Sequence, residues 1–232
     1  MRKKWKKWKI WHTIKNYLVQ LSVVVLGIFI TFGISDYIKE KQERKEFRQL
    51  IFFLKTELEN NLSYLQKNRR DFEYMRRGTE LIYQVKGECR KLPLDTLKTY
   101  YNLPLYYSSF AYNQYAMDLI RDKASSQSFS SPELLFNLLD CYVSLQSYKE
   151  NVERYTQKIY DSLSDIRVDF IYNYAENNDI LGHWEYLMKF QGVRNRMLDF
   201  GNLKDYIRQA ENNEKKIGEV LAKLEKELKE ES

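Results

Sequence analysis

The chain has 232 residues, a net charge of +6 and two cysteines, too few for a disulfide framework. The positive charge lies in residues 1–16, which carry seven Lys or Arg and no acid, so the rest of the chain holds slightly more acid than base. A nucleic-acid-binding domain needs a basic face of its own, and this distribution therefore argues against nucleic acid as a partner.

The chain opens with a basic tail that is rich in tryptophan. Trp5, Trp8 and Trp11 recur every three residues, on or near one helical face, with lysines between them. Together with Tyr17 and Tyr37 they have the composition of interfacial membrane anchors, and the lysines would lie against anionic headgroups.

Residues 17–35, YLVQLSVVVLGIFITFGIS, form an uncharged apolar stretch. As a helix these residues rise roughly 28 Å, close to the hydrocarbon thickness of a bilayer. A single segment in lipid satisfies its backbone polar groups only as a helix, so the sequence predicts one transmembrane helix. More Lys and Arg precede the stretch than follow it closely. This asymmetry favours a cytoplasmic N-terminus, with the domain 36–232 outside the cytoplasm.

Two further interpretations concern the same stretch. A cleaved signal peptide would also begin with a basic region, but the apolar run is long for one and an amphipathic pattern follows directly, which favours an uncleaved anchor. Gly27, Thr31 and Ser35 recur every four residues on one face, a spacing that lets two helices approach closely. The pattern indicates self-association, and ordinary span composition is the simpler explanation.

The region after residue 36 is predicted to continue the helix. No Gly or Pro occurs up to about residue 75, and the apolar residues form one stripe with alternating spacings of four and three. Asn61 and Asn68 occupy two positions of this stripe. Buried asparagines in such a seam can fix register or oligomeric state, whereas exposed ones near a helix bend would have no such role, and the sequence leaves both readings open.

Residues 87–108 are the least regular part of the chain, and the helix before them is predicted to end at Gly78 or Gly87. A short helix is predicted between Pro93 and Pro104. A cluster of six tyrosines lies here and just beyond: Tyr100, Tyr101, Tyr106, Tyr107, Tyr112 and Tyr115. Such a cluster either lines a ligand or partner surface or caps the end of a helical bundle with its hydroxyls in water.

The second half of the chain predicts further helices. Residues 111–123 read as a short amphipathic helix with Tyr115 or Ala116 inward. A serine followed by Pro132 and an acid then marks the start of a long helix over 132–174. An aromatic connector over residues 183–190 follows, and a last heptad-like helix begins between 192 and 202.

The predicted fold is all-α. One N-terminal transmembrane helix continues into a long helix of an antiparallel three- or four-helix bundle. The helix that leaves the membrane and the helix over 132–174 have similar lengths and matching apolar seams. Two such helices most simply pack antiparallel.

Two stretches of the chain carry a resemblance to a known family. The first is VVLGIFI at 24–30, which runs into the charged helix of residues 38–62. The second is YAMDLIRDKASSQSFSSPELLFNLLDCY at 115–142. In both, the chain resembles a family of uncharacterised bacterial single-pass membrane proteins, filed as a domain of unknown function. The resemblance implies a span in a bacterial inner membrane followed by a helical domain, and it brings no activity or site residues. The chain departs from the family at residues 33–36.

Few residues point to catalytic chemistry. His12 and His183 are the two histidines, too few for a His-rich metal site, and neither has a Glu three residues before it, as in di-metal bundles. Both glycine-rich nucleotide-binding motifs are missing. We therefore expect no enzyme activity, cofactor or metal. Cys89 and Cys141 either form one disulfide outside the cytoplasm or are buried thiols, and the apolar setting of Cys141 favours thiols.

These features predict a membrane-anchored, non-enzymatic interaction or scaffold protein. Its expected partners are the lipid bilayer and either a second copy of the chain or another envelope protein. One alternative is a sensory module whose tyrosine-rich end binds a small ligand and which acts through a membrane partner. Another is a membrane-active effector whose tryptophan-lysine tail disturbs bilayers.

Overall fold

The computed structural model describes residues 2–123, 131–163, 166, 178–198 and 201–230. It describes the backbone alone for residues 2–25, 27–33 and 230. Every regular element in the described ranges is helical, which confirms the predicted all-α class for this part of the chain. The chain divides into two compact units, residues 1–50 (unit 1) and residues 51–232 (unit 2).

Unit 1 consists of the first part of helix α1 (Arg2–Gln84), whose later part belongs to unit 2. The predicted span, residues 17–35, is therefore helical throughout. Most of its side chains lie outside the described residues. Where side chains are described, no helix is both long enough and apolar enough to cross a membrane. The transmembrane helix remains a prediction.

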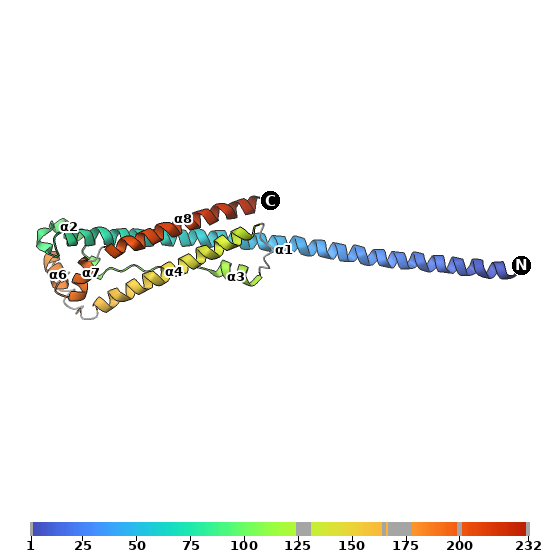
Figure 1. Cartoon of the computed structure of the whole chain (residues 1–232), viewed down its shortest axis with the longest axis horizontal. Coiled ribbons are helices and arrows are strands. Elements are labelled where there is room, and N and C mark those ends of the chain that lie inside the picture. Colours follow the sequence, from blue (N-terminus) through green and yellow to red (C-terminus); the bar gives the residue numbers. More distant parts are fainter. Residues whose placement is uncertain (1, 124–130, 164–165, 167–177, 199–200, 231–232) are drawn as a thin grey trace. The chain divides into compact units, whose positions relative to one another are not determined.

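Unit 2 is built around three long helices in its described residues (Figure 1). They are α1 from residue 51 onward, α4 (Pro132–Leu163) and α8 (Gly201–Glu230). The short elements are η1 (Cys89–Lys91), α2 (Leu94–Thr99), η2 (Leu103–Leu105), α3 (Tyr115–Lys123), α6 (Ile180–Leu187) and α7 (Gln191–Leu198). Within unit 2, α2, α6 and α7 gather at the end where α1 stops, and α3 lies toward the opposite end (Figure 1).

The apolar stripe predicted on α1 forms its buried face in unit 2. Seven of its residues are at most 2% exposed: Ile51, Leu54, Leu58, Leu65, Phe72, Met75 and Ile82. The helix runs past Gly78 and ends before Gly87, whose φ of +79° is a backbone conformation that glycine adopts without a steric penalty. The start of α4 is also as predicted, because the Ser131 hydroxyl accepts a hydrogen bond from the Glu133 N–H at 3.2 Å.

The long helices α1 and α4 run parallel, so the predicted antiparallel packing of this pair is wrong. Glu57 of α1 bonds Tyr142 of α4, and Asn68 bonds Tyr148, so residue numbers rise in the same direction along both helices. Further along, the Phe72 ring packs on Tyr155, with ring centroids 5.7 Å apart.

Helix α8 is the antiparallel member of the bundle. Lys55 of α1 pairs with Glu225 at 2.9 Å, whereas Arg69 pairs with Glu214 at 2.7 Å, so residue numbers fall along α8 as they rise along α1. The same holds against α4, where Lys216 pairs with Asp140 at 2.7 Å. The described part of unit 2 therefore has two parallel long helices and one antiparallel to both.

The parallel pair is possible because residues 106–114, which we call the return segment, carry the chain back along the unit without forming a helix. Asn68 contacts Ser108, and seven residues earlier Asn61 contacts Asn113, so the segment runs opposite to α1. Its last residues occupy positions where a helix was predicted from 111, and α3 consequently starts only at Tyr115. Residues 167–174, the predicted end of the α4 helix, lie outside the described residues.

Candidate functional site

The return segment satisfies its backbone polar groups with side chains of the surrounding helices. Asn61 of α1, fully buried, donates from Nδ2 to the Asn113 carbonyl at 2.7 Å and accepts from the Asn113 N–H at 2.8 Å. The Asn61 amide thus pairs with both backbone polar groups of Asn113, as a residue of a neighbouring β-strand would. The Thr156 hydroxyl of α4 donates to the Ser108 carbonyl at 3.0 Å. Backbone groups facing the bundle would be costly without such partners, so these side chains stabilise a non-helical segment that lies against the long helices.

Asn68 makes the second set of bonds to the return segment and is 2% exposed. Its Nδ2 donates to the Ser108 hydroxyl at 2.7 Å and to the Ser109 carbonyl at 3.2 Å. Its Oδ1 accepts from the Tyr148 hydroxyl at 2.5 Å, and burial raises the pKa of this tyrosine. The two asparagines proposed from sequence to set a helix register thus lie together on α1, where they hold the return segment.

Glu57 fixes the start of α3 from α1. One carboxylate oxygen accepts from the Ala116 N–H at 2.9 Å, in the first turn of α3, where an anion is favoured by the helix dipole. The other accepts from the Tyr142 hydroxyl at 2.5 Å. Burial, together with this bond, raises the pKa of Tyr142. Three segments distant in sequence therefore meet at one buried carboxylate.

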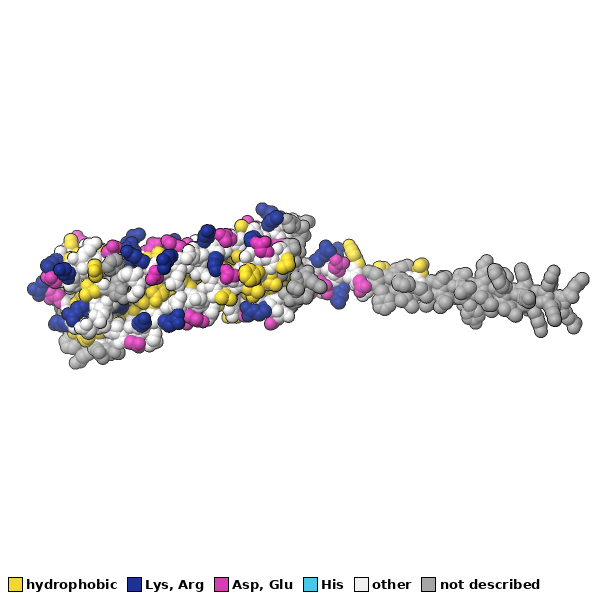
Figure 2. Space-filling view, viewed as in Figure 1, with side chains coloured by type: hydrophobic (Ala, Val, Ile, Leu, Met, Phe, Trp, Pro, Cys, Tyr) yellow, Lys and Arg dark blue, Asp and Glu magenta, His cyan; other side chains and the backbone are white. Residues whose placement is uncertain are grey.

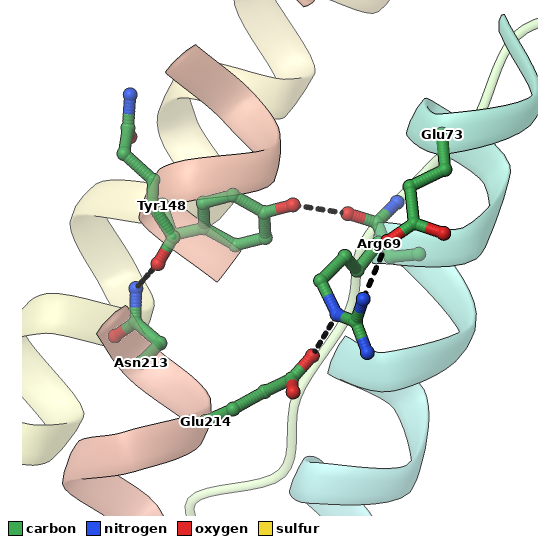
Figure 3. A network of polar contacts seen from close by, with 7 residues as sticks. Arg69, Glu73, Tyr148, Asn213 and Glu214 are labelled. Atoms are coloured by element: carbon green, nitrogen blue, oxygen red, sulfur yellow. Dashed lines mark hydrogen bonds and ion pairs between the residues drawn. The ribbon is translucent and has the colours of Figure 1, made fainter. Parts of the chain in front are cut away.

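An ion pair joins α1 to α8, and the hydrogen bond from Tyr148 to Asn68 adds α4 to the same region (Figure 3). Arg69 of α1 lies between Glu73 on its own helix, at 2.5 Å, and Glu214 of α8, at 2.7 Å. Tyr148 of α4 points toward α1 across the same region (Figure 3). The charged side chains are 19–27% exposed, so solvent screens the pairs only partly.

The predicted tyrosine surface is divided among different contacts. Tyr100 and Tyr106 pack against Tyr74 of α1, with ring centroids 5.1 and 5.6 Å apart. Tyr101 stacks on His183 with centroids 4.0 Å apart. These three tyrosines therefore contribute to packing at or near the end of the bundle where α1 stops.

The other three tyrosines lie further along the chain. Tyr107 packs on Tyr160 with centroids 4.9 Å apart, and the Tyr112 hydroxyl donates to Gln146 at 2.8 Å. Tyr115 is 78% exposed, and its neighbour Ala116 is the residue that faces inward. Tyr106 and Tyr107 share a groove of about 330 Å³ beside α1, so part of the cluster does line a concave surface.

The end of the bundle is closed by α6, in the stretch read from sequence as an aromatic connector. Trp184 is fully buried and donates from its indole to the Leu97 carbonyl at 3.0 Å. His183 is also fully buried, and its Nε2 lies 3.1 Å from the Tyr101 carbonyl, to which it donates. Burial lowers the pKa of His183, so the ring stays neutral near pH 7.

Several other predicted positions have little structural description. The side chains of Trp5, Trp8, Trp11, Tyr17 and Thr31 lie outside the described residues, as does position 27 beyond its helical backbone.

Ser35 and Tyr37 are exposed on α1.

Cys89 and Cys141 are both free and buried, and burial raises their thiol pKa values to about 11 and about 12. Among the described side chains, no group of three or more His, Cys, Asp or Glu is placed to hold a metal ion.

The sequence reading missed a cleft of about 460 Å³ between α4, α7 and α8. Arg196 of α7 lines it and is largely buried, whereas Arg194, two residues earlier, is exposed. The sequence offers one weak sign of this difference. Arg196 follows the buried Val193 by three residues and precedes the buried Met197, so it lies at the edge of the apolar face of α7.

The surface of unit 2 also carries large hydrophobic side chains on α3 and on the first half of α4. We call this set the α3–α4 surface: Tyr115, Leu119, Phe136 and Val143 are 78%, 46%, 70% and 67% exposed. The two helices meet at Glu57, which bonds Ala116 and Tyr142, the sequence neighbours of two of these residues. Figure 2 shows hydrophobic side chains gathered over α3.

Compared with protein-family models, curated proteins and solved structures, the chain matches none. The resemblance to single-pass membrane proteins therefore remains an expectation from sequence.

Proposed function

We propose that this chain is a membrane-anchored helical protein that acts by binding a second copy of itself through the α3–α4 surface. The observation behind the proposal is the exposure of that surface. Phe136 is 70% exposed and Val143 is 67% exposed, seven residues further along α4 and so on the same face. Clustered large hydrophobic side chains on a soluble surface mark interaction sites.

Membrane anchoring is supported by the sequence of unit 1. The uncharged residues 17–35 lie within the continuous helix α1, and the tail before them is basic and rich in tryptophan. Two chains held in one membrane meet at a high effective concentration, so a modest apolar surface is enough for pairing. The small residues Gly27, Thr31 and Ser35 would add a second contact between neighbouring copies.

Photo-crosslinking in membranes tests the pairing. We expect a benzophenone amino acid at position 136 of the full chain to give, on illumination, an adduct of twice the chain mass. The control places the same probe at Lys215 of α8, whose side chain is 80% exposed. An adduct with a different membrane protein would show that the surface binds an envelope partner and not a second copy of the chain. No adduct above the level of the control would refute the proposed surface.

Membrane attachment is tested separately by alkaline carbonate extraction. The full chain is expected to stay in the membrane pellet, and a chain lacking residues 17–35 is expected to enter the supernatant. Release of the full chain would contradict the anchor without bearing on the crosslinking result.

A further inference from the structure

The cleft between α4, α7 and α8 has the size of a small-molecule site, about 460 Å³. Polar side chains from all three helices line much of it: Asn151, Lys158, Asn195, Arg196, Asp205 and Gln209. Gly192 of α7 and Ser162 of α4 both line it, and a Cβ atom at Gly192 would lie 3.0 Å from Cα and 3.1 Å from the carbonyl oxygen of Ser162. The wall between α4 and α7 is therefore tightly packed.

Arg196 is incompletely satisfied in this wall. A guanidinium has five N–H donors. Nη2 donates to the Leu103 carbonyl and, at 3.2 Å, to the Tyr106 carbonyl, which helps to hold the start of the return segment. Nε and Nη1 are shielded from water and have no acceptor among the described residues. The structural role of Arg196 therefore accounts for one of its three nitrogens.

In the part of the chain that the structure describes, no carboxylate forms an ion pair with Arg196. Burial lowers its pKa, and the electrostatic interaction opposing this shift comes from the Tyr155 phenol. Arginine nevertheless stays protonated in proteins, so a positive charge lies behind this wall. A buried charge without an anion nearby is destabilising. An anion in the adjoining cleft would supply the opposite charge.

The other charges of the cleft are consistent with an anionic occupant. Lys158 of α4 is exposed, and no described carboxylate forms an ion pair with it. Asp205, the acid of the cleft, is paired with Arg208 at 2.8 Å, which reduces its repulsion of an anion. The net local charge of Lys158, Arg196 and the Asp205–Arg208 pair is therefore positive.

We propose that this cleft binds a small oxyanion, a carboxylate or a phosphate group, contacted directly by Lys158 and attracted by the charge of Arg196. Attraction by Arg196 needs no direct contact, because a unit charge acts over several ångströms where little water intervenes. The site is separate from the α3–α4 surface and adds ligand binding to a protein proposed to act through protein contacts.

Thermal unfolding of the full chain in a mild detergent tests the proposal. Sodium phosphate and sodium succinate are each compared with sodium chloride at equal ionic strength. We expect one of the two to raise the Tm by about 5–10 °C at a hundredfold excess over its Kd. Which anion acts distinguishes a phosphate from a carboxylate ligand. Lys158→Gln should weaken binding about tenfold, whereas Lys149→Gln on the same helix, outside the cleft, should leave it unchanged.

Two outcomes would overturn the anion site. One is the lack of a rise with either anion beyond that in chloride. The other is an equal rise in the parent and in Lys158→Gln, because exclusion of salts from the surface stabilises any variant alike. Arg196→Met should abolish the response, and if that variant does not unfold cooperatively, Lys158→Gln alone decides.

Discussion

Replacing Asn68 by Leu distinguishes two interpretations of this residue, because they predict opposite changes in the free energy of unfolding. In an apolar helix seam, Leu would stabilise the protein, because a buried Asn there costs stability. In the structure, Leu leaves the Tyr148 hydroxyl and the Ser109 carbonyl without their partner, while the Ser108 hydroxyl keeps its bond to Asp71 at 2.9 Å. The unpaired Tyr148 hydroxyl costs about 1–3 kcal/mol, each lost bond to the return segment costs about 1 kcal/mol, and burying Leu returns about 1.5–3 kcal/mol. We expect a net loss of about 1–2 kcal/mol.

The loss corresponds to a fall in Tm of about 2–8 °C for a chain of this size. Far-ultraviolet circular dichroism of the full chain in detergent measures it. The matched control is the double variant Asn68→Leu with Tyr148→Phe, which removes the stranded hydroxyl and should recover about 1 kcal/mol or more. A Tm equal to or above that of the parent would refute the assignment of Asn68 to the return segment.

Three further predictions use the same melting assay or simple chemistry. Gly192→Ala should lower the free energy of unfolding by about 1–3 kcal/mol, because the added Cβ meets the α4 backbone. Gly218→Ala, whose Cβ would have nothing within 4 Å, should raise it by about 0.5–1 kcal/mol. Equal effects of the two variants would contradict the close packing at the cleft. The folded state holds His183 neutral with a lowered pKa, so stability should be full above about pH 6.5 and fall as the pH drops further, and His183→Phe should flatten this fall between about pH 7.5 and about pH 5.5. Cys89 and Cys141, with thiol pKa values raised to about 11 and about 12, should resist a thiol reagent at about pH 8 until the protein is denatured, and fast labelling of the folded chain would show that they are accessible.

The helices of unit 2 could be predicted because their information is local. The stripe on α1, from Ile51 to Ile82, follows a helical period, and the residues it names are buried. Three consecutive residues, a serine, Pro132 and an acid, determine the start of α4. In both cases a window of one or two turns contains the whole reason for the structure.

The return segment could not be predicted, because its partners are distant in sequence. The residues that bond it on α1 lie 37–52 positions away, and Thr156 lies 48 positions away. Nothing in residues 106–114 alternates as a strand would, and the polar stripe on α1 looks the same whether it faces a helix or an extended chain. The direction of α4 depends on this segment, so the parallel packing of α1 and α4 could not be predicted either. Arg196 was missed for a similar reason, since its burial depends on carbonyls some 90 residues earlier.

The return segment also bears on the order in which unit 2 assembles. Hairpin-linked helices form contacts between near neighbours in sequence and fold quickly, but here the bonds from α1 to α4 span 80 and 85 residues. The ion pair from Arg69 to Glu214 spans 145. During synthesis, the apolar face of α1 therefore remains uncovered by α4 for at least 80 residues and by α8 for longer still. We expect such a nascent chain to be more prone to aggregation than its helical content alone would suggest.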